Sequence, residues 1–389
     1  MSKEKRRVPK LRFPGFTEDW EQRKLESLFT KYEDKVSTPD SGYWRLGLRS
    51  HCKGTFYTYV DAGHELETTE MYRVKAGNFI LNITFAWERA LAVTDDEDQG
   101  KLVSHRFPQF KPNDDLVIDF FKHTLMDKRF KHHLELSSPG GAGRNKVLKV
   151  SDMLKYELLV PSIQEQNIIS SFLNNVDYII TLHQRKLNNL KLKKKALLQK
   201  LFPKNGERYP ELRFPGFTDA WEQRKLTSFT QRVKGNDGRM DLPTLTISAS
   251  EGWLNQKDRF SANIAGSEQK NYTLLRQGEL SYNHGNSKLA KYGVVYALKD
   301  YKEALVPRVY HSFRVDESYD ALFVEYYFST KRPDRELGKL VSSGARMDGL
   351  LNIGYDEFTN ISISVPTFSE QKQIVALLKV CDKYITLHQ

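Results

Sequence analysis

Residues 9–25 read PKLRFPGFTEDWEQRKL and residues 210–226 read PELRFPGFTDAWEQRKL, so the two segments are identical at 14 of 17 positions. A second repeated pair follows: VPSIQEQNIISSFLNNVDYIITLHQ ends at Gln184, and VPTFSEQKQIVALLKVCDKYITLHQ ends at Gln389. The long stretches between these segments barely resemble each other. Because the period far exceeds the ~20–50 residues of solenoid repeats, the pattern indicates a duplicated domain in which one scaffold carries two different binding segments.

Length and charge narrow the class of protein. A chain of 389 residues predicts two or three domains of about 100–200 residues each. The net charge of +11 and the pI near 9.3 favour polyanionic partners, because Lys and Arg that neutralise phosphates release condensed counterions. Nucleic acid is therefore the first partner to consider, and a merely basic soluble protein is the alternative.

The cysteine content and the hydropathy indicate where the chain works. Cys52 and Cys381 are too few for a disulfide framework or a Cys-rich zinc site, which favours a reducing cytoplasm. The N-terminal MSKEKRRVPK lacks the apolar stretch of a secretory signal. No window approaches the ~18 uncharged apolar residues of a membrane span, so no membrane association is expected.

Each repeat is predicted to contain a globular part followed by a long helix. The expected boundaries are a globular domain at 1–160, a helix at 161–203, a second globular domain at 204–365 and a shortened helix at 366–389. Short runs bounded by Gly, Asn and Asp turns predict strands, and these runs are 79–84, 116–121, 242–248 and 292–298. The expected fold class is mixed α+β.

The two helices have matching start signals. Ser162 and Glu165 stand in capping-box spacing after Pro161, and Thr367 and Glu370 repeat the arrangement. Phe202 and Pro203 should end the first helix after roughly 40 residues. Only about 23 residues follow Pro366, so the second helix is expected to be shorter.

Apolar residues on these helices follow the alternating 4,3 spacing of a coiled coil. The predicted helix-pairing seam comprises Ile169, Leu173, Val176, Ile180, His183, Leu187, Leu190, Ile374, Leu378, Cys381 and Ile385. We expect the two helices to pair antiparallel within one chain and so to form an internal pseudo-twofold. Pairing between two molecules is the alternative. His183 and His388 occupy equivalent positions and are interpreted as polar residues that set the register, not as metal ligands.

No catalytic motif is recognisable. The chain has no G-x-x-x-x-G-K-[ST] loop for ATP, and Asp334 and Glu336 lack the acidic-x-Lys partner of a nuclease site. The adjacent His132 and His133 point about 100° apart on a helix and could not readily share a metal. The sequence therefore predicts a chain without catalytic residues or metal ligands.

Gly-rich turns and polar loops at matching places in the two repeats are the candidates for binding DNA. Amides and cations can contact base edges, and forked guanidinium groups can hold a phosphate or the guanine O6/N7 edge. The candidate DNA-binding residues are Lys53, Asn82, Thr84, Arg89, Arg144, Lys146, Asn283, His284, Asn286, Lys288, Lys291 and Arg346. A plain surface turn is the alternative at Arg144 and Arg346.

The repeated LRFPGFT-x-x-WEQRKL segment, the strand ending in VP, the E-Q-x-x-I helix start with D-x-x-I-T-L-H-Q, and KKALLQKLFP at 194–203 together resemble a type I restriction-modification specificity subunit. The resemblance implies two target recognition domains joined by long conserved helices that pair as an antiparallel intramolecular coiled coil. It also implies a non-catalytic subunit that binds double-stranded DNA. Its expected partners are two modification subunits, which methylate adenine with S-adenosylmethionine, and two restriction subunits, which use ATP and Mg²⁺. The chain itself should bind no cofactor.

Two other classes of function remain open from the residues alone. One is a DNA-cleaving enzyme with unrecognised carboxylates, and the other is a coiled-coil adaptor that binds only protein. An adaptor would release no counterions on meeting DNA, so the salt dependence of DNA affinity separates it from a DNA-binding subunit.

Overall fold

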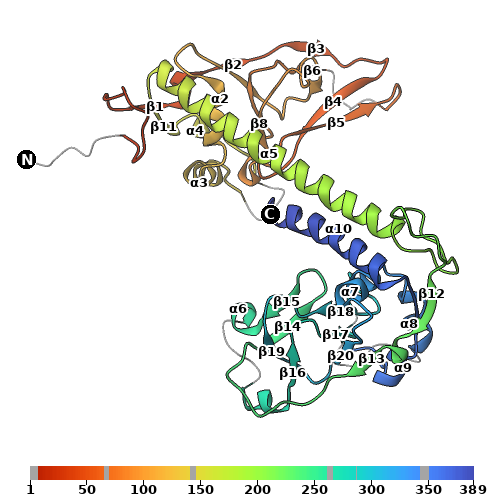
Figure 1. The fold of residues 1–389 in the computed structure, drawn as a ribbon. Coiled ribbons are helices and arrows are strands. Elements are labelled where there is room, and N and C mark those ends of the chain that lie inside the picture. The colour runs from red at the N-terminus through yellow and green to blue at the C-terminus, as the bar shows by residue number, and fades with distance from the viewer. Residues whose placement is uncertain (1–7, 65–69, 141–145, 261–265, 286, 342–349) are drawn as a thin grey trace, which may run out of the picture. The chain divides into compact units, whose positions relative to one another are not determined.

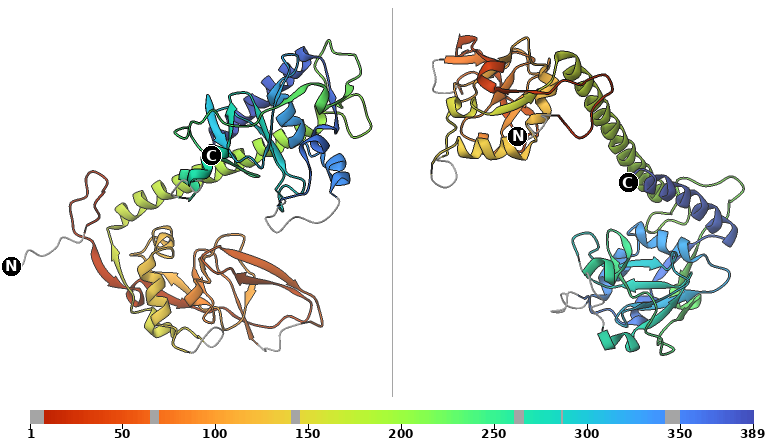
Figure 2. Two further views of the ribbon diagram at one scale, coloured as in Figure 1. Left: turned by 90° about the horizontal axis from the view of Figure 1, so that it is seen from below. Right: turned by 90° about the vertical axis from the view of Figure 1, so that its left-hand side faces the viewer.

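The computed structural model describes residues 8–64, 70–140, 146–260, 266–285, 287–341 and 350–389. The chain divides into two compact units, Met1–Ile180 and Thr181–Gln389, and the division falls within the long helix α5 (Ile163–Lys200). Each unit combines helices with mostly antiparallel sheets, as Figures 1 and 2 show. The fold is therefore the mixed α+β class predicted from the sequence.

Unit 1 builds its core between helices and two larger sheets. The strands are β1 (Glu21–Lys24), β2 (Phe29–Tyr32), β3 (Lys35–Ser37), β4 (Tyr43–Leu48), β5 (Thr55–Val60), β6 (Glu70–Arg73), β7 (Phe79–Leu81), β8 (Leu91–Val93), β9 (Leu102–Val103), β10 (Gln109–Pro112) and β11 (Glu157–Val160). The helices before α5 are α1 (Leu25–Leu28), η1 (Ala86–Glu88), α2 (Ile118–Thr124), α3 (Lys128–Leu136) and α4 (Val150–Met153). The sheet orders are β1-β11, β2-β10-β7-β8 and β3-β6-β9-β4-β5.

Unit 2 contains the C-terminal half of α5 and the rest of the chain. Its strands are β12 (Glu222–Lys225), β13 (Thr230–Arg232), β14 (Leu245–Ser248), β15 (Gly252–Asn255), β16 (Thr273–Arg276), β17 (Leu280–Asn283), β18 (Val294–Ala297), β19 (Glu303–Val306), β20 (His311–Val315) and β21 (Ser362–Val365). Its other helices are η3 (Leu226–Ser228), α6 (Gln256–Phe260), η4 (Gly266–Asn271), α7 (Ala321–Ser329), α8 (Asp334–Leu340), α9 (Tyr355–Thr359) and α10 (Phe368–Thr386).

The two units share the strand order of two sheets and differ in the rest. The pair β1-β11 corresponds to β12-β21, and the order β2-β10-β7-β8 corresponds to β13-β20-β17-β18. Where unit 1 adds a five-stranded sheet, unit 2 has the two-stranded sheets β14-β15 and β16-β19. The common scaffold thus extends beyond the segments whose sequences repeat.

One strand prediction is wrong. The run 116–121 was expected to be extended, but its second half begins helix α2. Phe121 of this helix and Leu125, which caps its C-terminal end, are both buried in the core of unit 1. A short apolar run fits a buried helix as well as a strand, so periodicity could not separate the two.

The start of each long helix is fixed by a buried ion pair. The Ser162 hydroxyl accepts a hydrogen bond from the Glu165 backbone N–H at 3.4 Å, as a capping box requires. The Glu165 carboxylate, however, binds Arg12 of the repeated N-terminal segment through two hydrogen bonds of 2.7 Å, rather than the cap backbone. In unit 2, Arg213 and Glu370 form the same two bonds at 2.9 Å. Both glutamate side chains are only 1% exposed.

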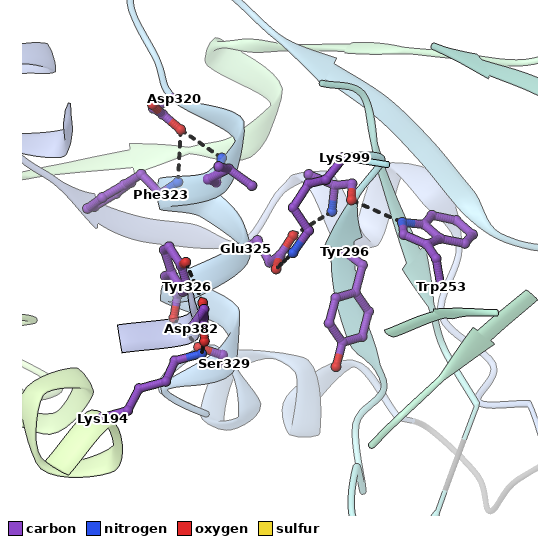
Figure 3. Close-up of polar contacts among 12 residues, drawn as sticks. Lys194, Trp253, Tyr296, Lys299, Asp320, Phe323, Glu325, Tyr326, Ser329 and Asp382 are labelled. Carbon is purple, nitrogen blue, oxygen red and sulfur yellow. Dashed lines mark hydrogen bonds and ion pairs between the residues drawn. The ribbon is translucent and has the colours of Figure 1, made fainter. Parts of the chain in front are cut away.

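Within unit 2, α10 runs antiparallel beside the C-terminal half of α5 (Figures 1 and 2). Leu187 and Leu190 of α5 and Cys381 and Ile385 of α10 are partly buried. His183 Nδ1 lies 3.4 Å from His388 Nδ1. Ile374 and Leu378 are buried in one cluster with Leu198 and Leu201. Near the middle of the pair, Lys194 and Asp382 form an ion pair, and Tyr326 of α7 donates a hydrogen bond of 2.7 Å to the same carboxylate (Figure 3).

The predicted seam does not continue along the first half of α5. Ile169 packs against the core of unit 1, with Leu173 lining a cavity there, whereas Val176 and Ile180 are 36% and 47% exposed. The reason is length, because α10 has 19 residues and α5 has 38, so α10 can accompany only about half of its neighbour.

Candidate nucleic-acid interface

In unit 1, three separate segments meet beside the end of β7. The Leu148 N–H donates to the Ile83 carbonyl at 2.8 Å, which ties the segment containing Lys146 to the loop after β7. The Cys52 N–H donates to the Arg89 carbonyl at 2.9 Å, so the turn that contains Lys53 lies next to the end of the same loop. Lys53, the loop 82–89 and Lys146 are therefore neighbouring parts of one surface, which we call the unit 1 loop cluster.

Internal bonds set the shape of the loop 82–89. The Asn82 side-chain oxygen accepts from the Thr84 N–H at 3.0 Å, a local turn that Asn favours. The Trp87 indole donates to the Thr84 carbonyl at 3.2 Å, and the Lys146 ammonium lies 5.0 Å from the Trp87 ring centroid. Arg89 has a left-handed backbone with φ of 61°. Sequence reasoning missed Trp87, although an aromatic ring between the candidate amides and cations was a usable signal.

In unit 2, the loop after β17 is tied down in the same way. The Leu351 N–H donates to the His284 carbonyl at 2.9 Å, and Gly285 forms an antiparallel bridge with Leu350. This bond is the counterpart of the Leu148 to Ile83 bond in unit 1. The loop after β17, whose described residues are 284–285 and 287–291, therefore lies beside the segment 350–351. We call this the unit 2 loop cluster.

His284 does not fit the predicted role of DNA contact. Its side chain is 6% exposed, its Nδ1 lies 2.7 Å from the Leu351 carbonyl oxygen and its Nε2 lies 2.9 Å from the Val309 carbonyl oxygen. The ring also stacks on His311, with centroids 4.8 Å apart. His284 contributes to the core under the loop, because its position directly after β17 turns the ring inward.

The Asn283 amide is also used within the protein. Its nitrogen donates to the Ile247 carbonyl at 3.3 Å, and its oxygen accepts from the Gly285 N–H at 3.1 Å. Gly293 closes the loop with φ of 80°, and a Cβ there would lie 2.4 Å from the Asn283 carbonyl oxygen, so this turn requires glycine. Lys288 and Lys291 are exposed. Candidates Arg144, Asn286 and Arg346 lie outside the described residues.

A second set of exposed groups in unit 1 was not predicted. Trp44, Phe56 and Tyr59 on the hairpin β4–β5 are 53%, 38% and 47% exposed. The Trp44 and Tyr59 rings pack edge to face at 5.1 Å, and the Arg49 guanidinium lies 5.3 Å from the Phe56 ring centroid. Four aromatic or basic side chains on one hairpin can stack on bases or meet phosphate.

The part of the chain that the structure describes contains no group of three or more His, Cys, Asp or Glu side chains placed to hold a metal ion. Of the acidic pair noted in the sequence, Glu336 pairs with Lys339 at 2.7 Å. Burial raises the pKa of Asp334. Among the described helices, none has the length and apolar character needed to cross a membrane.

The chain resembles one known protein family and several solved structures. Residues 17–192 match the family described as type I restriction modification DNA specificity domain. The type I restriction-modification S subunit from M. genitalium aligns with a TM-score of 0.56 at 12% identity, covering 98% of this chain and 94% of that one. The HsdS subunit from Thermoanaerobacter tengcongensis aligns with a TM-score of 0.46 at 16% identity, covering 98% and 92%. No curated protein sequence matched.

The fold of the chain is similar to that of the M. genitalium S subunit. Residues 17–192 are similar to the type I restriction modification DNA specificity domain. This confirms the resemblance inferred from the repeated motifs. The family is generally non-catalytic.

Proposed function

We propose that the chain is the DNA-recognition subunit of a cytoplasmic type I restriction-modification complex. It binds a two-part target in double-stranded DNA, each globular domain reads one part, and the subunit positions two adenine-methylating modification subunits and two restriction subunits. S-adenosylmethionine, ATP and Mg²⁺ belong to those partners. The chain supplies recognition and catalyses no step.

The observation that carries this proposal is the pair of loop clusters. Both follow equivalent strands, β7 and β17, and both are tied by equivalent backbone bonds to the segment that leads back to the scaffold. Their residues nevertheless differ: the unit 1 cluster presents Trp87 and Lys146, whereas the unit 2 cluster presents Lys288 and Lys291. Different side chains on equivalent loops would read different sequences.

Binding to duplex DNA at several salt concentrations tests this proposal. We expect affinity to fall steeply as salt rises, because each phosphate contact releases counterions. Replacing Lys288 and Lys291 by Ala should reduce the salt slope by about 2, roughly one for each lost contact. Replacing exposed Lys379 and Lys383 of α10 is the matched control and should leave the slope unchanged.

The same preparation separates the alternative functions. With Mg²⁺ the purified chain should neither cut nor methylate DNA, and methylation should begin only when modification subunits and S-adenosylmethionine are added. Cleavage by the chain alone would favour a nuclease. Affinity that does not change with salt would favour a protein-binding adaptor.

A further inference from the structure

The β4–β5 hairpin of unit 1 (Figure 1) has one face that is basic and open to solvent. Side chains alternate along a strand, and Leu46 and Leu48, which are 1% and 8% exposed, pack in the core of unit 1. Arg45, Gly47 and Arg49 stand at the alternate positions. They therefore lie on the opposite, outer face of the hairpin.

An aromatic ring lies between the two arginines on this outer face. Phe56 is the partner of Gly47 across the hairpin, and a Cβ at Gly47 would lie 2.3 Å from the Phe56 ring. The ring therefore rests directly on the glycine backbone. The Arg49 guanidinium lies 5.3 Å from the ring centroid, and Phe56 is still 38% exposed. Arg45 stands opposite Thr58, one pair of outward-facing residues farther along. The face thus presents a flat apolar ring flanked by two cations.

The two arginines are available to an anion. Residues 43–60 contain Arg45, Arg49 and Lys53 and no Asp or Glu. The Arg49 guanidinium donates to the Thr55 carbonyl, and within the part of the chain that the structure describes neither Arg45 nor Arg49 has a carboxylate partner. A guanidinium group presents paired N–H donors that fit phosphate oxygens. The hairpin therefore combines phosphate-binding cations with an aromatic surface.

The outer face of the hairpin begins at the unit 1 loop cluster. The turn after β4 is bonded to the loop 82–89, because the His51 N–H donates to the Glu88 carbonyl at 2.8 Å beside the Cys52 bond already described. From Arg49 back to Arg45 the strand covers about 13 Å, at ~3.3 Å per residue. That length corresponds to about four base pairs, since one DNA strand rises about 3.4 Å per nucleotide. The hairpin can thus extend a DNA contact that starts at the loops.

Unit 2 has a hairpin of different character in this part of the chain. Its first hairpin after β13 is β14–β15, and residues 245–255 contain Glu251 and no Lys or Arg. The aromatic residue of that hairpin, Trp253, packs against a core cluster and donates to the Ala297 carbonyl at 3.1 Å. The β14–β15 hairpin therefore offers no cation to a phosphate.

We propose that the outer face of the β4–β5 hairpin binds the sugar–phosphate backbone of duplex DNA beside the bases that the unit 1 loop cluster reads. Arg45 and Arg49 hold phosphates, and the Phe56 ring packs on the deoxyribose between them. These contacts add affinity without sequence information, because every nucleotide has the same backbone. They also make the interface unequal, since the β14–β15 hairpin cannot supply them to the other half of the target. The inference rests on the proposed DNA recognition.

The test compares hydroxyl-radical footprints of the full chain with modification subunits, bound to a duplex that carries the methylated motif. The half of the motif that belongs to unit 1 is the half that changes when residues 27–159 are exchanged. For the Arg45→Ala/Arg49→Ala variant we expect protection to be lost over about four base pairs beside that half. The salt slope of binding should fall by about 2, and the methylated motif should stay the same. Phe56→Ala should weaken the same protection.

Trp44→Ala is the matched control, because Trp44 is a 53% exposed aromatic at an alternate position, on the opposite face of the same hairpin. It should give the footprint of the parent chain, and circular dichroism checks that all variants are folded. Three results would overturn the inference: an unchanged footprint and salt slope in the double variant, protection lost within the specified bases or beside the other half, or a different methylated motif. In each of these the parent complex still binds the duplex. Failure of the proposed function is distinct, because the parent complex itself would then show no salt-dependent binding.

Discussion

At the scale of single residues, the stacked pair of His284 and His311 supports the unit 2 loop cluster. Burial lowers the pKa of His311, the neighbouring His284 and Arg232 lower it further, and the Ile353 carbonyl acts in the opposite direction. Because the pKa of His311 in the folded chain lies below its unfolded value of about 6.5, the unfolded state binds more protons between these two values. Stability is therefore lost as pH falls below about 6.5.

This argument predicts that His311→Gln reduces the pH dependence of stability. Urea unfolding of the full chain at pH 7.5 and at pH 5.5 gives the free energy of unfolding of each protein. The parent chain should lose more stability between the two conditions than the variant, since Gln carries no titrating group. An equal loss in both would show that His311 is not protonated on unfolding.

A second residue-scale prediction concerns the ion pair at the helix start. Glu370→Gln should destabilise unit 2 by about 2 kcal/mol, because Arg213 keeps its position but loses two charge-assisted hydrogen bonds to a buried carboxylate. Glu165→Gln should act in the same direction on unit 1. The control is Glu211→Gln, an exposed partner of Lys200 whose loss should leave thermal unfolding unchanged.

The partners of individual side chains could not be predicted from the sequence. The spacing of Ser162 and Glu165 predicted the helix start correctly but assigned Glu165 to the wrong partner, because Arg12 is 153 positions away. The loop after β17 was located correctly, yet the direction of the His284 ring depends on contacts with Val309 and Leu351. Such long-range contacts leave no trace in local spacing.

At the scale of elements, the pairing of α5 with α10 was the strongest periodic signal. The 4,3 spacing identified an apolar stripe on each helix. On α5, the first half of this stripe packs against unit 1 and the second half lies beside α10. Ile169 packs on the core of unit 1, whereas Leu187 lies in the half of α5 beside α10. Periodicity reports that a face is apolar and not what covers it.

Charge reversal tests the pairing of the two helices. Lys194→Glu should destabilise unit 2 by about 1 kcal/mol, because it places two negative charges together beside Tyr326. Adding Asp382→Lys should recover part of this loss in a double-mutant cycle. Additive losses in the double variant would mean that the two side chains do not interact in solution.

At the scale of the whole molecule, the repeated sequence showed that the chain is duplicated, but the structure shared by the two units is larger than the repeated segments. Repeats were visible only at the ends of each unit, yet β2-β10-β7-β8 and β13-β20-β17-β18 share one strand order despite dissimilar sequences. Strand order tolerates many apolar sequences, since burial and alternation are all that a strand requires. The predicted recognition loops lie on this shared sheet.

Because each unit has its own predicted recognition loops, we expect each unit to be exchangeable without affecting the other. Exchanging residues 27–159 for the corresponding segment of another specificity subunit should change one half of the methylated DNA sequence and leave the other half intact. Sequencing the methylated sites in cells that express the exchanged chain with modification subunits gives the answer. A change in both halves would contradict the assignment of one reader to each unit.

The central claim is that one chain reads two different, separated DNA sequences, and mapping methylated adenines with the unaltered chain and modification subunits tests it most directly. We predict one motif with two unlike halves separated by a constant gap of unspecified bases. A single continuous motif, or two identical halves, would contradict the account.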